Sequence, residues 1–425
     1  MKRILIKNGI LDGSLKDIFI EGNRIKRISN EIDAKIIPNE NLKIIEADRK
    51  YIMPTFVNMH THAAMTLTRG YKEDVPLFEW LDKIWKLESG LDDELVYWGT
   101  RLACLEMIQS GTTFFNDQYF YLDATAKAVE DSGIRALLTY VFLDGGDQEK
   151  AVRQRKECEE MYEKSKKWGP NIIFGVSIHA HYTVCDENML WASDFCKKHD
   201  LKLHTHLLET RKELYDFQQK YGVSPVRRLD DMEILNENVI AAHSLWLSQE
   251  DIEILGKRKV TCVHNVNSNL KLASGYKFKY NELKDSGCNV TLGTDGCGSS
   301  NNLDMLETMK TTALLQKAWR NNPAVMPIDE LLATATVNGA KTFNLDIGEI
   351  KEGNLADLML INTNSAAFIP NYDFLANFIY SANSSCIDTL ICDGNILMEK
   401  RKVKGEKEIL ENAQKAANEL VSKLH

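Results

Sequence analysis

The stretch that decides the fold is Pro54-Thr55-Phe56-Val57-Asn58-Met59-His60-Thr61-His62, a short apolar run that ends in two histidines one residue apart. Successive side chains of a strand point to opposite faces, so His60 and His62 share a face. Two imidazoles on one face at a strand end suit a metal site in a concave surface. Two hydrogen-bonded structural histidines would give the same pattern. A metal site is therefore indicated only if other candidate ligands lie at the ends of neighbouring strands.

From Pro54 onward, short apolar runs alternate with long helical patterns, the last of which runs from Ile328 to Thr342. This alternation over residues 54–346 predicts a (β/α)₈ barrel of the TIM type, with a doubly wound parallel sheet as the competing architecture. In a barrel the carboxyl ends of all strands open onto one face. Polar residues that follow the apolar runs would therefore meet.

The two ends of the chain have a different pattern. Residues 1–53 and the segments 356–361 and 387–397 are typical of β-hairpins, with turns rich in Gly, Asn and Asp. We therefore expect residues 1–53 and 347–425 to form one small composite β-sandwich domain around a catalytic barrel of residues 54–346. A terminal amphipathic helix should close this domain, with an apolar face made of Ile409, Leu410, Ala413, Ala416, Leu420 and Val421.

Composition excludes several classes of protein. The net charge of -9 over 425 residues argues against a nucleic-acid partner, because phosphate binding requires a basic face. Nine cysteines without regular spacing indicate free thiols in a reducing compartment, and the lack of a Cys-x-x-Cys motif argues against a zinc ribbon or a cysteine-ligated nucleobase deaminase. No apolar stretch is long enough to span a membrane. We expect a cytoplasmic enzyme with a small-molecule substrate.

Candidate ligands lie where the apolar runs end. Asp295 follows such a run, and Glu209, just past a histidine, is placed as a proton shuttle. Three neutral imidazoles and one carboxylate suit Zn²⁺, with Fe²⁺ or Mn²⁺ as alternatives. One of His179, His181 and His204 is expected to be a structural histidine. Eight of the ten histidines lie where apolar runs end: His60, His62, His179, His181, His204, His206, His243 and His264.

Four segments in order resemble the amidohydrolase superfamily, and within it the branch of 5-methylthioadenosine/S-adenosylhomocysteine deaminases and triazine chlorohydrolases. The resemblance covers nearly the whole chain, and Gly353 to Leu358 matches the return to the composite domain. The four segments are His60-Thr61-His62-Ala63-Ala64-Met65-Thr66-Leu67-Thr68-Arg69-Gly70, His204-Thr205-His206-Leu207-Leu208-Glu209-Thr210, Asn267-Ser268-Asn269-Leu270-Lys271-Leu272-Ala273-Ser274-Gly275 and Gly293-Thr294-Asp295-Gly296.

The resemblance implies a single divalent metal and no bridging carboxylated lysine. Its ligands would be His60, His62, His206 and Asp295. The family resemblance also makes a homo-oligomer the expected state.

The resemblance further implies the roles of the residues around the metal. Glu209 would protonate the heterocycle nitrogen, while His243 and Asp295 would orient and deprotonate the attacking water. His179 matches a substrate-contacting histidine, and Glu88 matches the carboxylate that binds the ribose hydroxyls. Without the resemblance, Glu88 would be interpreted as a helix-surface acid.

The implied reaction is hydrolytic deamination of an adenosine-type nucleoside, in which water attacks C6, ammonia leaves and the inosine analogue is formed. Two alternatives come from other classes. One is deamination or chlorohydrolysis of another heterocycle, such as a pterin, a guanine-like base or a triazine. The other is a non-catalytic barrel that serves as an interaction scaffold, which the presence of every ligand and of Glu209 disfavours.

Three departures from the family pattern bear on the substrate. His181 and Val266 stand where the family usually has proline, and His181 would add a donor or acceptor near the pocket. The arginine expected near Tyr140 to Phe142 is missing, although Arg153 or Arg155 could supply one. If neither does, S-adenosylhomocysteine should bind poorly, because its carboxylate would lack a bidentate partner. Uncharged substituents at the 5' position are then favoured: 5'-methylthioadenosine, 5'-deoxyadenosine or adenosine.

Overall fold

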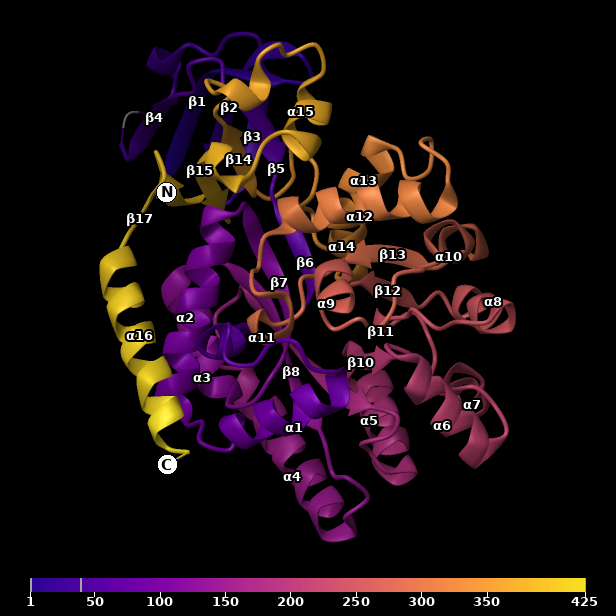
Figure 1. Ribbon diagram of the computed structural model, residues 1–425. Helices are drawn as coiled ribbons and strands as arrows, with labels where there is room; N and C mark the ends of the chain where they lie inside the picture. Colours follow the sequence, from indigo (N-terminus) through magenta and orange to yellow (C-terminus); the bar gives the residue numbers. More distant parts are fainter. Residues whose placement is uncertain (1, 39, 425) are drawn as a thin grey trace.

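The computed structural model describes residues 2–38 and 40–424, and a barrel of eight parallel strands lies at its centre (Figure 1). The strands follow one another in sequence order around the barrel, which a doubly wound sheet would not allow. The main-chain N–H of Asp295, just after the last strand, donates to the carbonyl of His60 in the first at 2.9 Å. The predicted barrel is confirmed. Its strands are β6 (Phe56–Thr61), β7 (Thr112–Gln118), β8 (Arg135–Phe142), β9 (Ile172–Ala180), β10 (Leu203–Leu207), β11 (Val239–His243), β12 (Thr261–His264) and β13 (Asn289–Leu292).

Helices cover the outside of the barrel and side chains fill its inside, so its strands are buried on both faces, as every residue of β6 and β7 shows. This double burial explains the nearly continuous apolar runs in the sequence. The outer and connecting helices are α1 (Leu77–Glu88), α2 (Asp93–Gln109), α3 (Leu122–Ser132), α4 (Gln148–Ser165), α5 (Asp186–His199), α6 (Arg211–Tyr221), α7 (Pro225–Asp231), α8 (Gln249–Lys257), α9 (Val266–Lys271), α10 (Tyr280–Ser286), α11 (Cys297–Ser300), α12 (Met305–Arg320), α13 (Ile328–Ala335) and α14 (Val337–Thr342).

The prediction of one continuous helix from Ile328 to Thr342 is wrong, because the structure has two helices there. The helical conformation breaks at Thr336, whose φ of -133° and ψ of -96° lie outside the helical region, so α13 ends and α14 begins in a new direction. The break lets Ala340 of α14 join the core inside the barrel, together with Val57 and Met59 of β6. Burying this short helix against the barrel interior outweighs the helical pattern of the sequence.

The two ends of the chain form one mixed sheet of nine strands (Figure 1). The sheet folds back on itself, because Ile25 of β3 exchanges main-chain hydrogen bonds with the segment 353–354 that precedes β14. The predicted sandwich is therefore a single curled sheet whose strands come from both termini. These are β1 (Arg3–Leu11), β2 (Ser14–Glu21), β3 (Arg24–Ser29), β4 (Leu42–Glu46), β5 (Tyr51–Pro54), β14 (Leu358–Ile361), β15 (Ile387–Cys392), β16 (Asn395–Glu399) and β17 (Lys402–Val403), with α15 (Phe374–Tyr380) inserted between β14 and β15.

The terminal helix α16 (Glu406–Ser422) leaves the composite sheet and runs along the side of the barrel, beside α2 (Figure 1). Ala413, Ala416 and Leu420 share one core cluster with residues of α1 and α2. Leu410 was predicted on the same face, but its side chain is 49% exposed. The helix therefore fastens the C-terminal segment to the barrel.

We propose that the chain divides into a barrel of residues 54–346 and a composite domain of residues 1–53 and 347–425. Residues 1, 39 and 425 lie outside the described part.

All nine cysteines are free thiols. Within the described ranges, no helix has the length and apolar character needed to cross a membrane.

A buried arginine joins the barrel to the composite domain. Arg135 at the start of β8 donates through Nε and Nη2 to the two carboxylate oxygens of Asp357, each at 3.2 Å, and through Nη2 to Asp393 at 2.6 Å. The Asp357 side chain is fully buried. Its charge therefore depends on Arg135 for compensation.

Replacing Arg135 by methionine should lower the urea midpoint of unfolding, because removing one partner of a buried ion pair typically costs about 3–5 kcal/mol. Equilibrium unfolding followed by circular dichroism measures the change. Lys127→Met breaks an exposed ion pair with Asp131 and should leave the midpoint unchanged. Equal midpoints for the Arg135 and Lys127 variants would show that the link contributes nothing to stability.

Candidate active site

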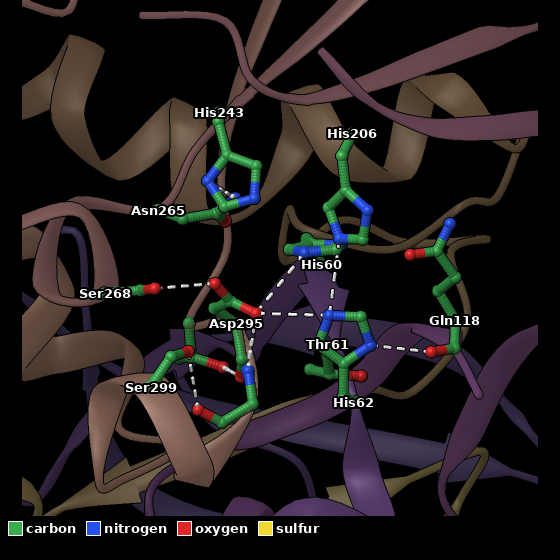
Figure 2. Close-up of polar contacts among 12 residues, drawn as sticks. His60, Thr61, His62, Gln118, His206, His243, Asn265, Ser268, Asp295 and Ser299 are labelled. Atoms are coloured by element: carbon green, nitrogen blue, oxygen red, sulfur yellow. Dashed lines mark hydrogen bonds and ion pairs between the residues drawn. The ribbon is translucent and has the colours of Figure 1, made fainter. Parts of the chain in front are cut away.

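Five of the predicted site residues converge at the carboxyl ends of the barrel strands (Figure 2). His60 lies in β6 and His62 just after it, while His206 lies in β10, His243 ends β11 and Asp295 follows β13. Donor atoms of His60, His62 and His206 lie within 4.8 Å of one another, and so do those of His60, His243 and Asp295. The segments carrying them are far apart in sequence, so the barrel alone brings them together.

Hydrogen bonds at Nδ1 orient the three histidines of the candidate metal site. His62 pairs with the carbonyl oxygen of Gln118 at 2.6 Å and His206 with the carbonyl oxygen of His179 at 2.8 Å, both on neighbouring strands. His60 pairs with Nε2 of His204 at 3.0 Å, which lies on β10, across the barrel from β6. An Nδ1–H that donates leaves the Nε2 lone pair free to bind a metal. The buried Nε2 of His60 has no hydrogen-bond partner within residues 2–38 and 40–424.

The spacing of the donor atoms fits a metal ion. Asp295 Oδ1 lies 3.5 Å from Nε2 of His60 and 3.3 Å from Nε2 of His62, and the latter lies 3.4 Å from Nε2 of His206 (Figure 2). A tetrahedral shell with bonds of about 2.1 Å separates neighbouring ligand atoms by about 3.4 Å. The site thus has the donor types and the spacing that a divalent ion requires.

The electrostatics of this group favour a cation. Burial lowers the pKa of His60 to about 4 and holds that of His206 well below its usual value, so both rings are neutral. Burial also lowers the pKa of His62, but the hydrogen bond and charge of Asp295 outweigh it and raise that pKa to about 9. The carboxylate therefore attracts a positive charge to this point, which a proton or a metal ion can supply.

One segment holds three of the reactive side chains in place. Ser268 of α9 donates to Oδ2 of Asp295 at 2.6 Å, which leaves Oδ1 facing the imidazoles (Figure 2). Asn269 donates through Nδ2 to Nδ1 of His243 at 2.9 Å, so the neutral ring carries its proton on Nε2. A little further on, Ser274 donates to Glu209. The short helix after β12 is thus a frame for the site.

Glu209 lies at the start of the loop after β10 and is buried. Its Oε1 accepts from Ser274 Oγ at 3.2 Å, and its Oε2 lies 3.7 Å from Nε2 of His243. Burial, followed by the negative charge of Asp295, raises the pKa of Glu209 to about 8. This carboxyl group therefore holds a proton at neutral pH and can donate it, as a general acid must.

Glu88 and His179 line the same cavity as Glu209, and so do Tyr119 and Trp85. Glu88, at the end of α1, is buried and accepts a hydrogen bond from the Tyr119 hydroxyl at 2.6 Å. The interpretation as a surface acid is therefore wrong, because the loop and helix after β6 cover the mouth of the barrel. Desolvation by burial raises the pKa of Glu88 to about 7.

Besides His60, three predicted histidines do not line this cavity. His204 is buried behind His60, and His264 stacks on Phe278 with its ring centroid 4.2 Å away. His181, which was expected to add a donor or acceptor near the pocket, lines a separate cavity of about 520 Å³ instead. The strand alternation of His179 and His181 breaks because β9 ends at Ala180 and the chain turns.

Neither arginine that could replace the missing one reaches the site. Arg153 is 63% exposed and pairs with Glu157 on the surface of α4. Arg155 donates to the side chain of Asn188 at 2.6 Å. Among the described residues, no lysine or arginine lines the cavity that contains Glu88 and Glu209.

Sequence reasoning missed the residues that support the ligands. Asp117 accepts from the Thr61 hydroxyl and from the N–H of Ala63, and so holds the chain on both sides of His62. The only signal for such residues was the segment Asn267 to Gly275, which resembled the family without revealing which side chains it holds. A buried carboxylate near the end of β7, such as Asp117, has no distinguishing neighbour in the sequence.

A family model described as the amidohydrolase family matches residues 51–397. The chain belongs to the amidohydrolase family. It is 41% identical over 423 residues to 5-methylthioadenosine/S-adenosylhomocysteine deaminase 1 from Archaeoglobus fulgidus, an alignment that covers 99% of this chain and 97% of the relative. It is 42% identical over 425 residues to 5'-deoxyadenosine deaminase from Methanospirillum hungatei, covering 99% and 95%. The resemblance found in the sequence is confirmed.

Solved amidohydrolases have the same fold. An adenosine deaminase from Xanthomonas campestris with bound zinc superposes with a TM-score of 0.89 at 29% identity, covering 99% of this chain and 98% of that structure. A triazine hydrolase variant gives the same TM-score at 20% identity, which shows the shared fold alone. Amidohydrolases are metal-dependent, and the donor set around Asp295 fits that dependence.

Replacing His206 by alanine should reduce the content of divalent metal from about one ion per chain to a small fraction, because a three-donor remnant binds far more weakly. Metal analysis of the purified protein, after dialysis against a weak chelator, measures the loss. His199→Ala, in the outer helix α5, removes a histidine outside the site and should keep the full metal content. Full metal content in the His206 variant would exclude this residue as a ligand.

Proposed function

We propose that this amidohydrolase is a metal-dependent hydrolytic deaminase of an adenosine-type nucleoside, with zinc as its metal. The observation that carries the proposal is one cavity lined by three of the proposed metal donors, His62, His206 and Asp295, and by the carboxyl groups of Glu209 and Glu88. The names of the relatives, which are deaminases of adenosine derivatives, support the same substrate class. The proposed products are ammonia and the inosine analogue.

We propose His60, His62, His206 and Asp295 as the metal ligands. When bound there, the metal supplies a water molecule whose pKa it lowers toward neutrality. The nucleophile has to be held and deprotonated by the chain.

His243 orients the nucleophilic water, and Asp295 deprotonates it. Because Nδ1 of His243 accepts from Asn269, its Nε2–H is the donor that orients the water oxygen. His243 cannot take the proton in this tautomer, and burial lowers its pKa to about 4. Asp295, whose Oδ2 is fixed by Ser268, is therefore the group that removes the proton. The sequence predicted that His243 and Asp295 together orient and deprotonate the water. The proposal gives the first task to His243 and the second to Asp295.

Glu209 is the proton donor to the ring nitrogen next to the reacting carbon. Its proton neutralises charge that develops on the ring as water adds, and the proton held by Asp295 then passes to the leaving amine. As ammonia leaves and the carbonyl group of the product forms, the remaining hydroxyl proton returns to Glu209. Both carboxyl groups are buried, so their proton transfers occur away from bulk water.

Glu88 suits the two ribose hydroxyls, because a carboxylate accepts two hydrogen bonds side by side. The Tyr119 hydroxyl already occupies one lone pair of its Oε1 and fixes the orientation. His179 packs edge-on against Trp85, with the ring centroids 6.0 Å apart, and both line the cavity that would hold the nucleoside. These contacts favour a nucleoside over a free base or a triazine.

The charges of the cavity favour a neutral group at the 5' position. Glu88, Glu209 and Asp295 are acidic, and within the described residues no basic side chain other than histidine lines the cavity. The amino-acid carboxylate of S-adenosylhomocysteine would lose its hydration without gaining a partner.

We expect ammonia release from 5'-deoxyadenosine, 5'-methylthioadenosine and adenosine, and a kcat/KM for S-adenosylhomocysteine lower by about tenfold or more, equivalent to one unpaired charge-assisted contact. A coupled ammonia assay on the metal-loaded enzyme measures both. Glu209→Gln should abolish turnover without releasing the metal, whereas Arg153→Ala should change neither value. S-adenosylhomocysteine as the best substrate would contradict the charge argument, and turnover confined to guanine, a pterin or a triazine would contradict the nucleoside assignment.

The rate should fall as the pH rises through about 8, because Glu209 must hold a proton to donate it and its raised pKa sets the upper limit. Ser274→Ala removes a hydrogen bond that stabilises the charged carboxylate and so should raise the pKa of Glu209 further. The alkaline limb of the kcat/KM profile should then move to higher pH. A limb that stays in place or moves to lower pH would assign it to another group.

The homo-oligomeric state and the cytoplasmic location remain predictions from the sequence.

A further inference from the structure

A second buried glutamate lies directly behind Glu209. Glu213, in the first turn of α6, is buried, with only 6% of its surface exposed. Its Oε1 accepts from the N–H of Leu208 at 2.7 Å, and its Oε2 accepts from the N–H of Glu209 at 2.8 Å and of Thr210 at 3.4 Å. One carboxylate thus binds three consecutive main-chain amides, the middle one being that of Glu209.

These contacts go beyond ordinary helix capping. In the capping box of α6, Thr210 and Glu213 bond each other's backbone, which accounts for the amide of Thr210 alone. The amides of Leu208 and Glu209 precede the cap. Leu208 has a φ of 49°, a left-handed conformation that is unfavourable for a leucine and persists only where its surroundings hold it.

His181 approaches the same carboxylate from β9. Its Nδ1 lies 3.4 Å from Oε1 of Glu213, and its ring packs edge-on against Phe217 with the centroids 4.7 Å apart. Within the described residues neither ring nitrogen has a hydrogen-bond partner. Nδ1 of His181 therefore faces Oε1 of Glu213 at contact distance, without the geometry of a hydrogen bond.

We propose that Glu213 is a positioning residue for the deamination: it fixes the backbone that carries Glu209, and His181 fixes Glu213. The proposal rests on the proposed role of Glu209 as proton donor. Glu213 does not line the substrate cavity, so it acts only through the placement of Glu209. A displacement of about 1 Å can reduce the rate of a positioned group by about a hundredfold.

The test compares Glu213→Gln with a matched variant. Asp251→Asn, in α8, removes the acid of a second capping box, made with Ser248, that has no contact with the loop after β10. The two variants lose equivalent buried caps, but only the first loses an acceptor of the Glu209 amide. With metal-loaded enzyme and 5'-deoxyadenosine, we expect kcat of Glu213→Gln to fall by about tenfold or more with KM within about threefold. We expect Asp251→Asn to keep its kcat.

A second readout does not depend on catalysis. Amide hydrogen exchange of the peptide containing residues 208–210 should be faster in Glu213→Gln than in the wild type and unchanged in Asp251→Asn. If the glutamine variant does not fold, Glu213→Asp replaces it in both measurements, because its shorter side chain cannot reach all three amides. His181→Ala should lower kcat less than Glu213→Gln does, and His181→Asn, which restores a donor, should recover part of the loss.

The results distinguish a failure of the positioning role of Glu213 from a failure of the proposed function. A Glu213→Gln enzyme with kcat within about twofold of the wild type, or an equal loss in Asp251→Asn, would overturn the positioning role. Wild-type enzyme inactive on every adenosine derivative would refute the proposed function instead. In that case unchanged exchange at residues 208–210 would still overturn the structural claim, and faster exchange would support it.

Discussion

The hydrogen bond from the N–H of Asp295 to the carbonyl of His60 is the interaction on which the site depends. It joins the last barrel strand to the first and so closes the sheet. The same two residues present their side chains to the candidate metal position, with Oδ1 and Nε2 3.5 Å apart. Closure of the barrel and assembly of the donor set are therefore one event. A strand that slipped by one residue would lose both the bond and the ligand.

Around this bond, the main chain of neighbouring strands does much of the orienting. Carbonyl groups at the ends of β7 and β9 accept from the imidazoles of His62 and His206. Strand ends offer such groups because the parallel ladder stops there and leaves carbonyls without a strand partner. The polar groups that a barrel leaves unpaired at its mouth thus become the supports of its reactive side chains. Side chains such as Ser268, Asn269 and Asp117 complete the set.

The parts predictable from the sequence were those with a strong local period or a distinctive residue type. The strand ends of β6, β10 and β11 were visible because histidines are rare and followed apolar runs. The placement of His181 was not predictable, because it depends on where β9 ends. The break at Thr336 and the burial of Glu88 depend on packing against distant residues. Glu213 resembles any surface glutamate of an outer helix, and only the fold shows that it points inward.

The composite sheet has a consequence for the making of the protein. Strand β5 pairs with β14, since Pro54 lies opposite Leu358, so the N-terminal hairpins emerge from the ribosome long before their partner exists. At synthesis rates of about 5–20 residues per second, the wait is on the order of 15–60 s. During that time the edge of β5 is an open template for pairing with other chains. Pairings between residues so far apart in sequence also form slowly after release. The nascent chain is thus most exposed to aggregation at the end that is made first.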